Sequence, residues 1–126
     1  MSVTVTHVAA APWTTPALPD GLRPDQLERG RQVKRQGLAA GEGGFHASHV
    51  SMPPGLVADR HHHDHSELIV ILRGSMEFDD GDSTVELVEH DSAVIDAGQV
   101  YGFTVGASGV EFLLVRAAKA ASQMAG

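Results

Sequence analysis

The feature that most constrains the fold is a series of short apolar or alternating runs that fills the chain after residue 44. Turn-forming residues such as Gly, Pro and Asp separate these runs at intervals of roughly ten residues. Short alternating runs are typical of half-buried strands, and their regular spacing indicates an all-β sandwich or barrel. We therefore predict antiparallel strands over residues 45–52, 68–72, 75–79, 83–88, 92–95, 101–105 and 110–116.

The 126 residues are close to the usual size of one domain, so we expect one core. Residues 1–40 are expected to form an N-terminal arm with edge strands, because four prolines before residue 25 remove backbone donors. Within this part, residues 26–36 fit a helix or a strand equally well. Residues 41–116 would form the barrel, and the alanine-rich tail 117–126 could form one or two helical turns if it docks.

The net charge of the chain indicates which classes of partner it can bind. The chain has 9 Lys and Arg against 16 Asp and Glu, a formal net charge of -7, so we expect no nucleic-acid partner. Five of the nine basic residues lie in 23–35, where a solvated face is the simplest reading and an anion-binding or dimer contact the alternative. No apolar run approaches the roughly 20 residues of a membrane span, and the start does not resemble a signal peptide. We expect a cytoplasmic protein with no membrane partner.

Histidine is the unusual residue of this chain, which has eight histidines and no cysteine. His61 and His63 are two apart, so on a strand both imidazoles point to the same side. A short turn after His63 would let Glu67 return a carboxylate to that side. Two imidazoles and a carboxylate suit Fe(II), Zn, Mn or Ni. His62 should point away and His65 should lie in the turn, so we expect both to be solvated or to support the ligands from outside.

This segment resembles the first motif of the cupin family, G-x5-H-x-H-x3-E-x6-G. The matching residues are Gly55, His61, His63, Glu67 and Gly74. The resemblance spans roughly residues 45–115 and implies a double-stranded β-helix, which is a jelly-roll barrel. It also implies one divalent transition metal ion (Fe, Mn, Ni or Zn) held by His61, His63 and Glu67.

The second motif of the family, G-x5-P-x-G-x2-H-x3-N, is matched only in part. Gly98 falls in place, whereas His90, Asp96, Tyr101 and Val105 stand at the positions of the first glycine, the proline, the histidine and the asparagine. The family's histidine is its fourth metal ligand. Three roles are therefore open for Tyr101: a metal ligand, a residue that transfers protons to or from substrate, or a filler of the space of a lost ligand.

The strand before the first motif offers candidates for the substrate cavity. His46 and Ser48 share one face of this strand, and in the family that face points into the barrel. We predict that both line the cavity. For His46, a ring that simply hydrogen-bonds to backbone groups is an equally open reading.

These observations predict a small metal-dependent cupin enzyme, with Tyr101 and Glu67 as its catalytic residues. A small, partly apolar molecule would bind at the ion and undergo dioxygenation or a lyase, isomerase or cyclase reaction. The alternative is a non-catalytic ligand-binding or sensing cupin with a degenerate metal site. We also expect a homodimer, because sheet edges need cover and the arm could cross to a partner.

Overall fold

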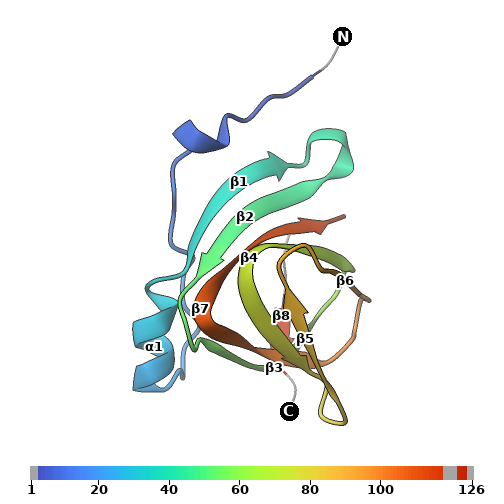
Figure 1. The fold of residues 1–126 in the computed structure, drawn as a ribbon. Helices are drawn as coiled ribbons and strands as arrows, with labels where there is room; N and C mark the ends of the chain where they lie inside the picture. Colours follow the sequence, from blue (N-terminus) through green and yellow to red (C-terminus); the bar gives the residue numbers. More distant parts are fainter. Residues whose placement is uncertain (1–2, 118–121, 125–126) are drawn as a thin grey trace.

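The computed structural model describes residues 3–117 and 122–124, and β-strands dominate the fold (Figure 1). This confirms the predicted all-β class. Two pairs of predicted strands are each one long strand, because backbone pairing continues across the residues between them. The strands are β1 (Lys34–Ala40), β2 (His46–Met52), β3 (Val57–His63), β4 (Glu67–Asp79), β5 (Thr84–Val88), β6 (Ser92–Ile95), β7 (Tyr101–Arg116) and β8 (Ser122–Met124).

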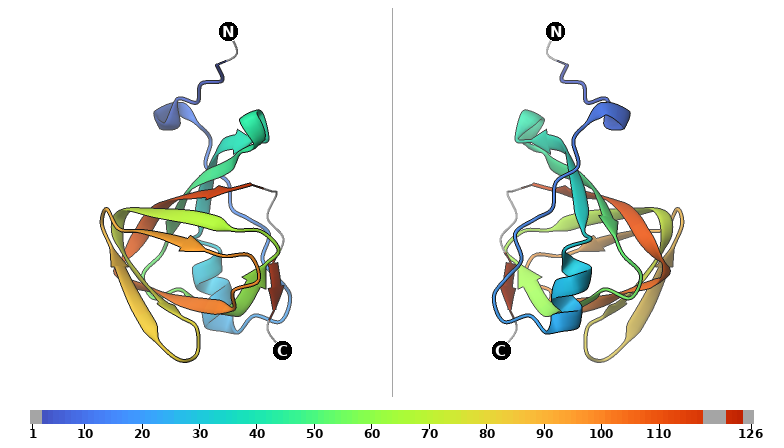
Figure 2. Two further views of the ribbon diagram at one scale, coloured as in Figure 1. Left: turned by 90° about the vertical axis from the view of Figure 1, so that its right-hand side faces the viewer. Right: turned by 90° about the vertical axis from the view of Figure 1, so that its left-hand side faces the viewer.

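The sheet closes into a barrel through its two longest strands. The strand order is β1-β2-β7-β3-β8, while β4 pairs with β5, β6 and β7, and every pairing is antiparallel. Because β4 and β7 pair with each other along most of their lengths and bend together, the remaining strands curl around a common core (Figures 1 and 2). This arrangement is the jelly-roll barrel that the first motif implies.

Gly74, the last residue of the first motif, allows β4 and β7 to stay paired where their register shifts. Its φ of 79° lies in the left-handed region, which disfavours any residue with a Cβ. A Cβ at this position would also overlap the carbonyl oxygen of Gly109. The motif therefore has glycine here for a backbone reason and not for a chemical one.

Alternation along the strands places one set of side chains inside the barrel. Ile69 and Ile71 of β4 are 4% and 0% exposed, whereas Leu68 and Leu72, on either side of this pair, are exposed. The buried apolar core comprises Val33, Val50, Leu56, Ile69, Ile71, Met76, Phe78, Leu87, Tyr101, Val105, Val110, Phe112 and Leu114.

One α-helix precedes the barrel, and the ambiguous residues 26–36 divide between this helix and β1. α1 (Pro24–Gly30) begins with a proline, whose missing N–H costs nothing in a first turn. The Gln26 side chain caps this turn by accepting a hydrogen bond from the Arg23 N–H at 3.0 Å. Its Nε2 also donates to Asp59 Oδ2 at 3.1 Å, which attaches the helix to β3.

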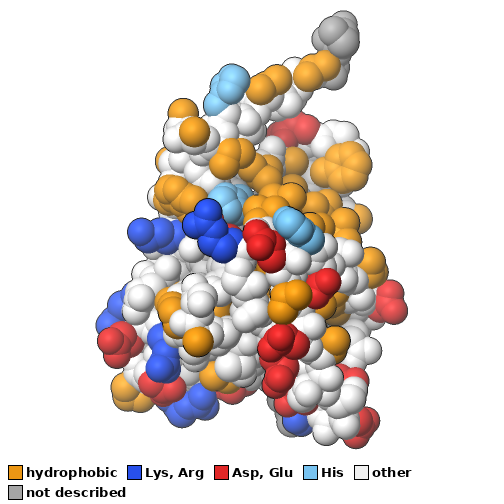
Figure 3. Space-filling model, in the orientation of Figure 1, with side chains coloured by type: hydrophobic (Ala, Val, Ile, Leu, Met, Phe, Trp, Pro, Cys, Tyr) orange, Lys and Arg blue, Asp and Glu red, His pale blue; other side chains and the backbone are white. Residues whose placement is uncertain are grey.

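The N-terminal arm, which contains the 3-10 turn η1 (Val8–Ala10), runs along β1, and a second such turn, η2 (Glu42–Gly44), joins β1 to β2. Gln36 is 2% exposed, and its Nε2 donates to the carbonyls of Val8 and Ala11 at 2.8 and 3.0 Å. Farther out, Val3 and Val5 are 65% and 66% exposed. Figure 3 shows hydrophobic side chains gathered over the arm and the β1–β2 hairpin.

Residues 122–124 of the tail form a strand, so the helical turns suggested by its alanine content are wrong there. β8 pairs with β3 along His61–His63, which places it beside the histidine-rich segment. The prediction for residues 118–121 and 125–126 lies outside the described residues. Within the described part of the chain, no helix is long and apolar enough to cross a membrane.

Candidate metal centre

Four polar side chains, from three strands of the barrel and the bend between two of them, meet at one point. His63 ends β3, His65 lies in the bend after it, Glu67 begins β4, and Tyr101 begins β7. Strand pairing places His61 of β3 opposite Tyr101, and it places Glu67 of β4 opposite Ile95, the last residue of β6 on the path to Tyr101. As expected, the bend after His63 brings the Glu67 carboxylate to the same side, with Oε1 3.1 Å from His63 Nε2.

The buried carboxylate of Glu67 organises this cluster. Its side chain is 3% exposed, and Oε1 lies 3.1 Å from His63 Nε2 and 3.4 Å from the Tyr101 hydroxyl. Oε2 faces the other way and lies 3.8 Å from Nη1 of Arg116, the last residue of β7. Burial lowers the pKa of Arg116, because desolvation disfavours its charged form, while Glu67 opposes this shift. The guanidinium thus places a positive charge beside a carboxylate that is buried in the core.

His65 is a member of the cluster that sequence reasoning missed. We expected this residue to be solvated or to support the ligands from outside, but it is 8% exposed, so the solvated reading is wrong. Its Nε2 is buried without a hydrogen-bond partner. One donor atom from each of His63, His65 and Glu67 lies within 4.8 Å of the others. The signal was a two-residue period that continues through the bend, from His61 to Glu67.

The protonation state of His65 suits metal binding. Desolvation by burial lowers its pKa, although the Glu67 carboxylate works in the opposite direction. A neutral imidazole keeps a lone pair on one nitrogen, and that lone pair is what a metal ion needs.

His61 lies beside this cluster. Its ring centroid is 4.9 Å from that of His63 and 4.8 Å from that of Tyr101. Its Nδ1 must donate to the carbonyl of Asp59 at 2.8 Å, which leaves the lone pair on Nε2. A hydrogen bond from the second ring nitrogen to a carbonyl is the usual support of a metal-ligating histidine. Its role as a ligand remains a prediction.

Tyr101 is held in its protonated form. The residue is 6% exposed, and burial raises its pKa well above the usual range, with the nearby Glu67 carboxylate raising it further. The hydroxyl therefore donates to Glu67 Oε1, and it also lies 3.2 Å from His63 Nε2. Without an ion these surroundings disfavour a phenolate. Edge-on packing against Phe78, with ring centroids 5.6 Å apart, fixes the ring.

The other predicted site residues lie farther along the sheet. Ser48 is buried opposite Leu114, and His46 is half-buried opposite Arg116. Neither is among the residues that line the pocket beside Tyr101. Their role in a substrate cavity remains a prediction. His62 is half-buried, with its Nδ1 buried and without a hydrogen-bond partner.

The donor set fits a divalent transition metal ion. Three observations support the fit: a buried carboxylate, a buried imidazole nitrogen without a partner, and a second imidazole within 4.8 Å of both. A buried polar atom without a partner costs free energy, which coordination of an ion would recover. Nitrogen and oxygen donors of this kind suit Fe, Mn, Ni or Zn.

Two solved structures cover most of this chain. The polyketide cyclase RemF from Streptomyces resistomycificus is 18% identical, with a TM-score of 0.77 over 99% of this chain and 87% of that chain. The DMSP lyase DddQ from Ruegeria pomeroyi DSS-3 is 21% identical, with a TM-score of 0.72 over 92% of this chain and 61% of that chain. At these identities the likeness shows the fold alone.

A third structure shows how widely the fold is shared. The cupin domain of Cnp3 from Schizosaccharomyces pombe is 22% identical, with a TM-score of 0.61 over 70% of this chain and 66% of that chain. A search of curated proteins gave no match. The family model described as "Cupin domain" matches residues 48–116, more than half of the chain, and this range includes both motifs. The chain therefore belongs to the cupin family.

Proposed function

We propose that this cupin is a metal-dependent enzyme that acts on a small organic molecule bound beside Glu67 and Tyr101. Two observations on His65 carry the proposal: its Nε2 is buried without a hydrogen-bond partner, and one of its ring nitrogens lies within 4.8 Å of donor atoms of His63 and Glu67. Two structural neighbours, a polyketide cyclase and a DMSP lyase, are enzymes by their descriptions, and this supports an enzymatic role.

His63, His65 and Glu67 would hold the ion, and His61 would join them through its Nε2. A bound divalent ion supplies Lewis-acid polarisation of a substrate oxygen. The protein would exclude water from the ligand atoms and hold the ligand side chains in fixed orientations. Arg116 and the Asp59 carbonyl do this from outside, by orienting Glu67 and His61 respectively.

Tyr101 and Glu67 would assist proton transfer to or from the substrate. The hydroxyl points its hydrogen at Glu67 Oε1, 3.4 Å away, and this long contact is easily replaced by one to a substrate oxygen. Tyr101 would then donate a hydrogen bond to that oxygen, and Glu67 would balance the charge. Because the pKa of Tyr101 is raised, it stabilises developing negative charge by hydrogen bonding better than by full proton loss.

Of the reactions compatible with these groups, we favour those that move protons without a redox change, namely lyase, isomerase or cyclase chemistry. A dioxygenase would use the same ligands but would consume O2. Oxygen uptake during turnover therefore separates the two, and no uptake is expected.

The experiment that tests the metal proposal is elemental analysis of untagged protein. Near-stoichiometric metal is expected in the native chain. The metal content should fall in His65→Ala and Glu67→Gln, because each substitution should lower the metal affinity at least about tenfold. His7→Ala, which removes an exposed histidine of the arm, is the matched control. Equal metal content in all four proteins would remove the assignment.

The second candidate function is a ligand-binding or sensing cupin without turnover. It is favoured by the departures in the second motif, where Asp96, Tyr101 and Val105 replace the family's proline, histidine and asparagine. In that case a ligand would bind and would be recovered unchanged.

A further inference from the structure

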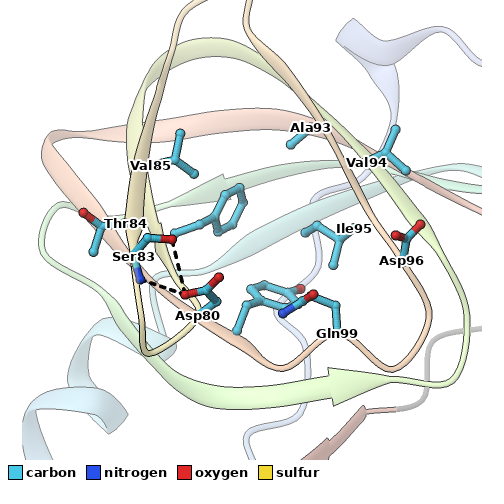
Figure 4. A pocket seen from close by; sticks show the side chains of 11 residues that line it. Asp80, Ser83, Thr84, Val85, Ala93, Val94, Ile95, Asp96 and Gln99 are labelled. Atoms are coloured by element: carbon cyan, nitrogen blue, oxygen red, sulfur yellow. Dashed lines mark hydrogen bonds between the residues drawn. The ribbon is translucent and has the colours of Figure 1, made fainter.

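A pocket of about 220 Å³ opens between the β4–β5 hairpin and the chain that leads from β6 to β7 (Figure 4). Tyr101 contributes to its lining while its hydroxyl contacts Glu67. Ile95 also lines the pocket, and its Cα is paired with that of Glu67 across β6 and β4. The pocket therefore adjoins the candidate metal centre through two neighbouring residues.

Part of the pocket wall is apolar, and the pocket is small. Phe78, Val85 and Ala93 line it together with Ile95, and the Phe78 ring stands edge-on to Tyr101 at an interplanar angle of 87°. Pockets for drug-sized ligands usually enclose about 300–1,000 Å³. At about 220 Å³ the space suits a molecule of one ring or a short branched chain.

The charged groups at the pocket are all negative. Figure 4 shows Asp80 and Asp96 on opposite sides of it, with Ile95 and Gln99 between them. Among the described residues that line the pocket, none is a lysine, arginine or histidine. Arg60, a cation close to this hairpin, is paired with Asp79 at 3.4 Å.

Asp80 is fixed in place as an anion. Its Oδ1 accepts hydrogen bonds from the backbone N–H groups of Asp82 and Ser83, both at 2.9 Å. These bonds stabilise the carboxylate and hold the hairpin loop that forms one side of the pocket. The carboxylate therefore stays in place when a ligand arrives.

We propose that this pocket binds the substrate of the metal centre, and that it admits small, partly apolar molecules without negative charge while discriminating against carboxylates and phosphates. This inference rests on the function proposed above. The apolar body would lie against Phe78 and Ile95, and a neutral oxygen would reach Tyr101. An anion would instead face two carboxylates, both exposed to solvent, on opposite sides of the pocket.

Three probes with one ring and different charge test the proposal: benzyl alcohol, benzylamine and benzoate. Titrations followed by amide NMR at neutral pH, with chelator present, measure affinity and location without any metal. We expect benzyl alcohol and benzylamine to shift the amides of Phe78 and Ile95. Benzoate should bind at least about fivefold more weakly than benzyl alcohol, because the carboxylates of Asp80 and Asp96 repel it even when solvent partly screens their charges. Benzylamine gains further from the carboxylates and aromatic faces.

Matched variants locate the binding and its selectivity. Val85→Trp should abolish binding by filling the pocket, whereas Val88→Trp, at an exposed valine of the same strand outside the lining, should not. Asp96→Asn should reduce the discrimination against benzoate by about twofold or more. Glu89→Gln removes one exposed charge outside the lining and should leave the discrimination unchanged.

Three results would overturn the proposal: equal affinity for benzoate and benzyl alcohol, binding that survives Val85→Trp, and no binding of any probe. Because the titrations contain chelator, these results say nothing against the metal centre. Conversely, selective binding in a protein that takes up no metal would overturn the proposed function and leave the selectivity of the pocket standing.

Discussion

Arg116→Gln tests whether the Glu67 carboxylate needs its buried counter-charge. The Arg116 and Glu67 side chains are 10% and 3% exposed, and Nη1 and Oε2 are 3.8 Å apart. Removing one partner of a buried pair costs about 3–5 kcal/mol. Here the contact is long, and Oε1 keeps its contacts with Tyr101 and His63. We therefore expect a loss of about 2–3 kcal/mol in the free energy of unfolding of the metal-free protein.

Urea denaturation of chelator-treated protein measures this loss, with unchanged m-values as evidence of two-state behaviour. Arg73→Gln is the control, because the Arg73 side chain is 81% exposed beside Glu111, and its loss should cost at most about 0.5 kcal/mol. The double variant Glu67→Gln, Arg116→Gln should recover part of the loss, since it removes both charges.

A bound ion should change the outcome in a definite direction. Arg116 places a positive charge beside a metal-binding carboxylate, so its removal should cost less stability in the metal-loaded protein than in the metal-free one. A cost below about 0.5 kcal/mol in metal-free Arg116→Gln would refute the argument that this pair neutralises a buried charge.

Other consequences can be checked on purified protein. Tyr101→Phe should keep its metal and lose most activity, as measured by elemental analysis and a turnover assay, whereas loss of the metal would make Tyr101 a ligand. Gly74→Ala should destabilise the protein by about 3 kcal/mol or more in urea denaturation, because its Cβ would meet the Gly109 carbonyl and φ is 79°. His90→Gly should stabilise it by about 0.5–1 kcal/mol, because His90 has a φ of 76° at the family's glycine position, and an unchanged or lower midpoint would contradict this. We expect light scattering to give the mass of a dimer, and deletion of residues 3–11, with their exposed valines, to shift it towards the monomer; a monomeric native chain would end this prediction.

The strands of the barrel could be predicted from sequence, because alternating apolar residues mark the buried face of a strand and turn residues mark its ends. The predicted breaks near Gly74 and within β7 were not breaks, since the chain bulges there while the two strands remain paired. Local patterns give no sign of such continuity, because it depends on the partner strand. The docking of Gln36 against the arm also depends on tertiary contacts, here two backbone carbonyls far away in the chain.

The candidate site was predictable in part. The motif spacing identified His63 and Glu67, which the structure brings together with Tyr101. His65 was missed because a position in a turn usually means exposure, whereas this bend keeps the two-residue period and turns the ring inwards. The pocket could not be predicted, because Asp80 and Asp96 come from two different loops whose proximity is set by the barrel.

The central claim is that His63, His65 and Glu67 hold a divalent ion, and a titration of chelator-treated, untagged protein with Zn²⁺ against a competing chromophoric chelator tests it most directly. The account predicts one tight site per chain, and an affinity reduced at least about tenfold in His65→Ala but little changed in His7→Ala. An affinity that is equal in the native protein and in both variants would contradict it.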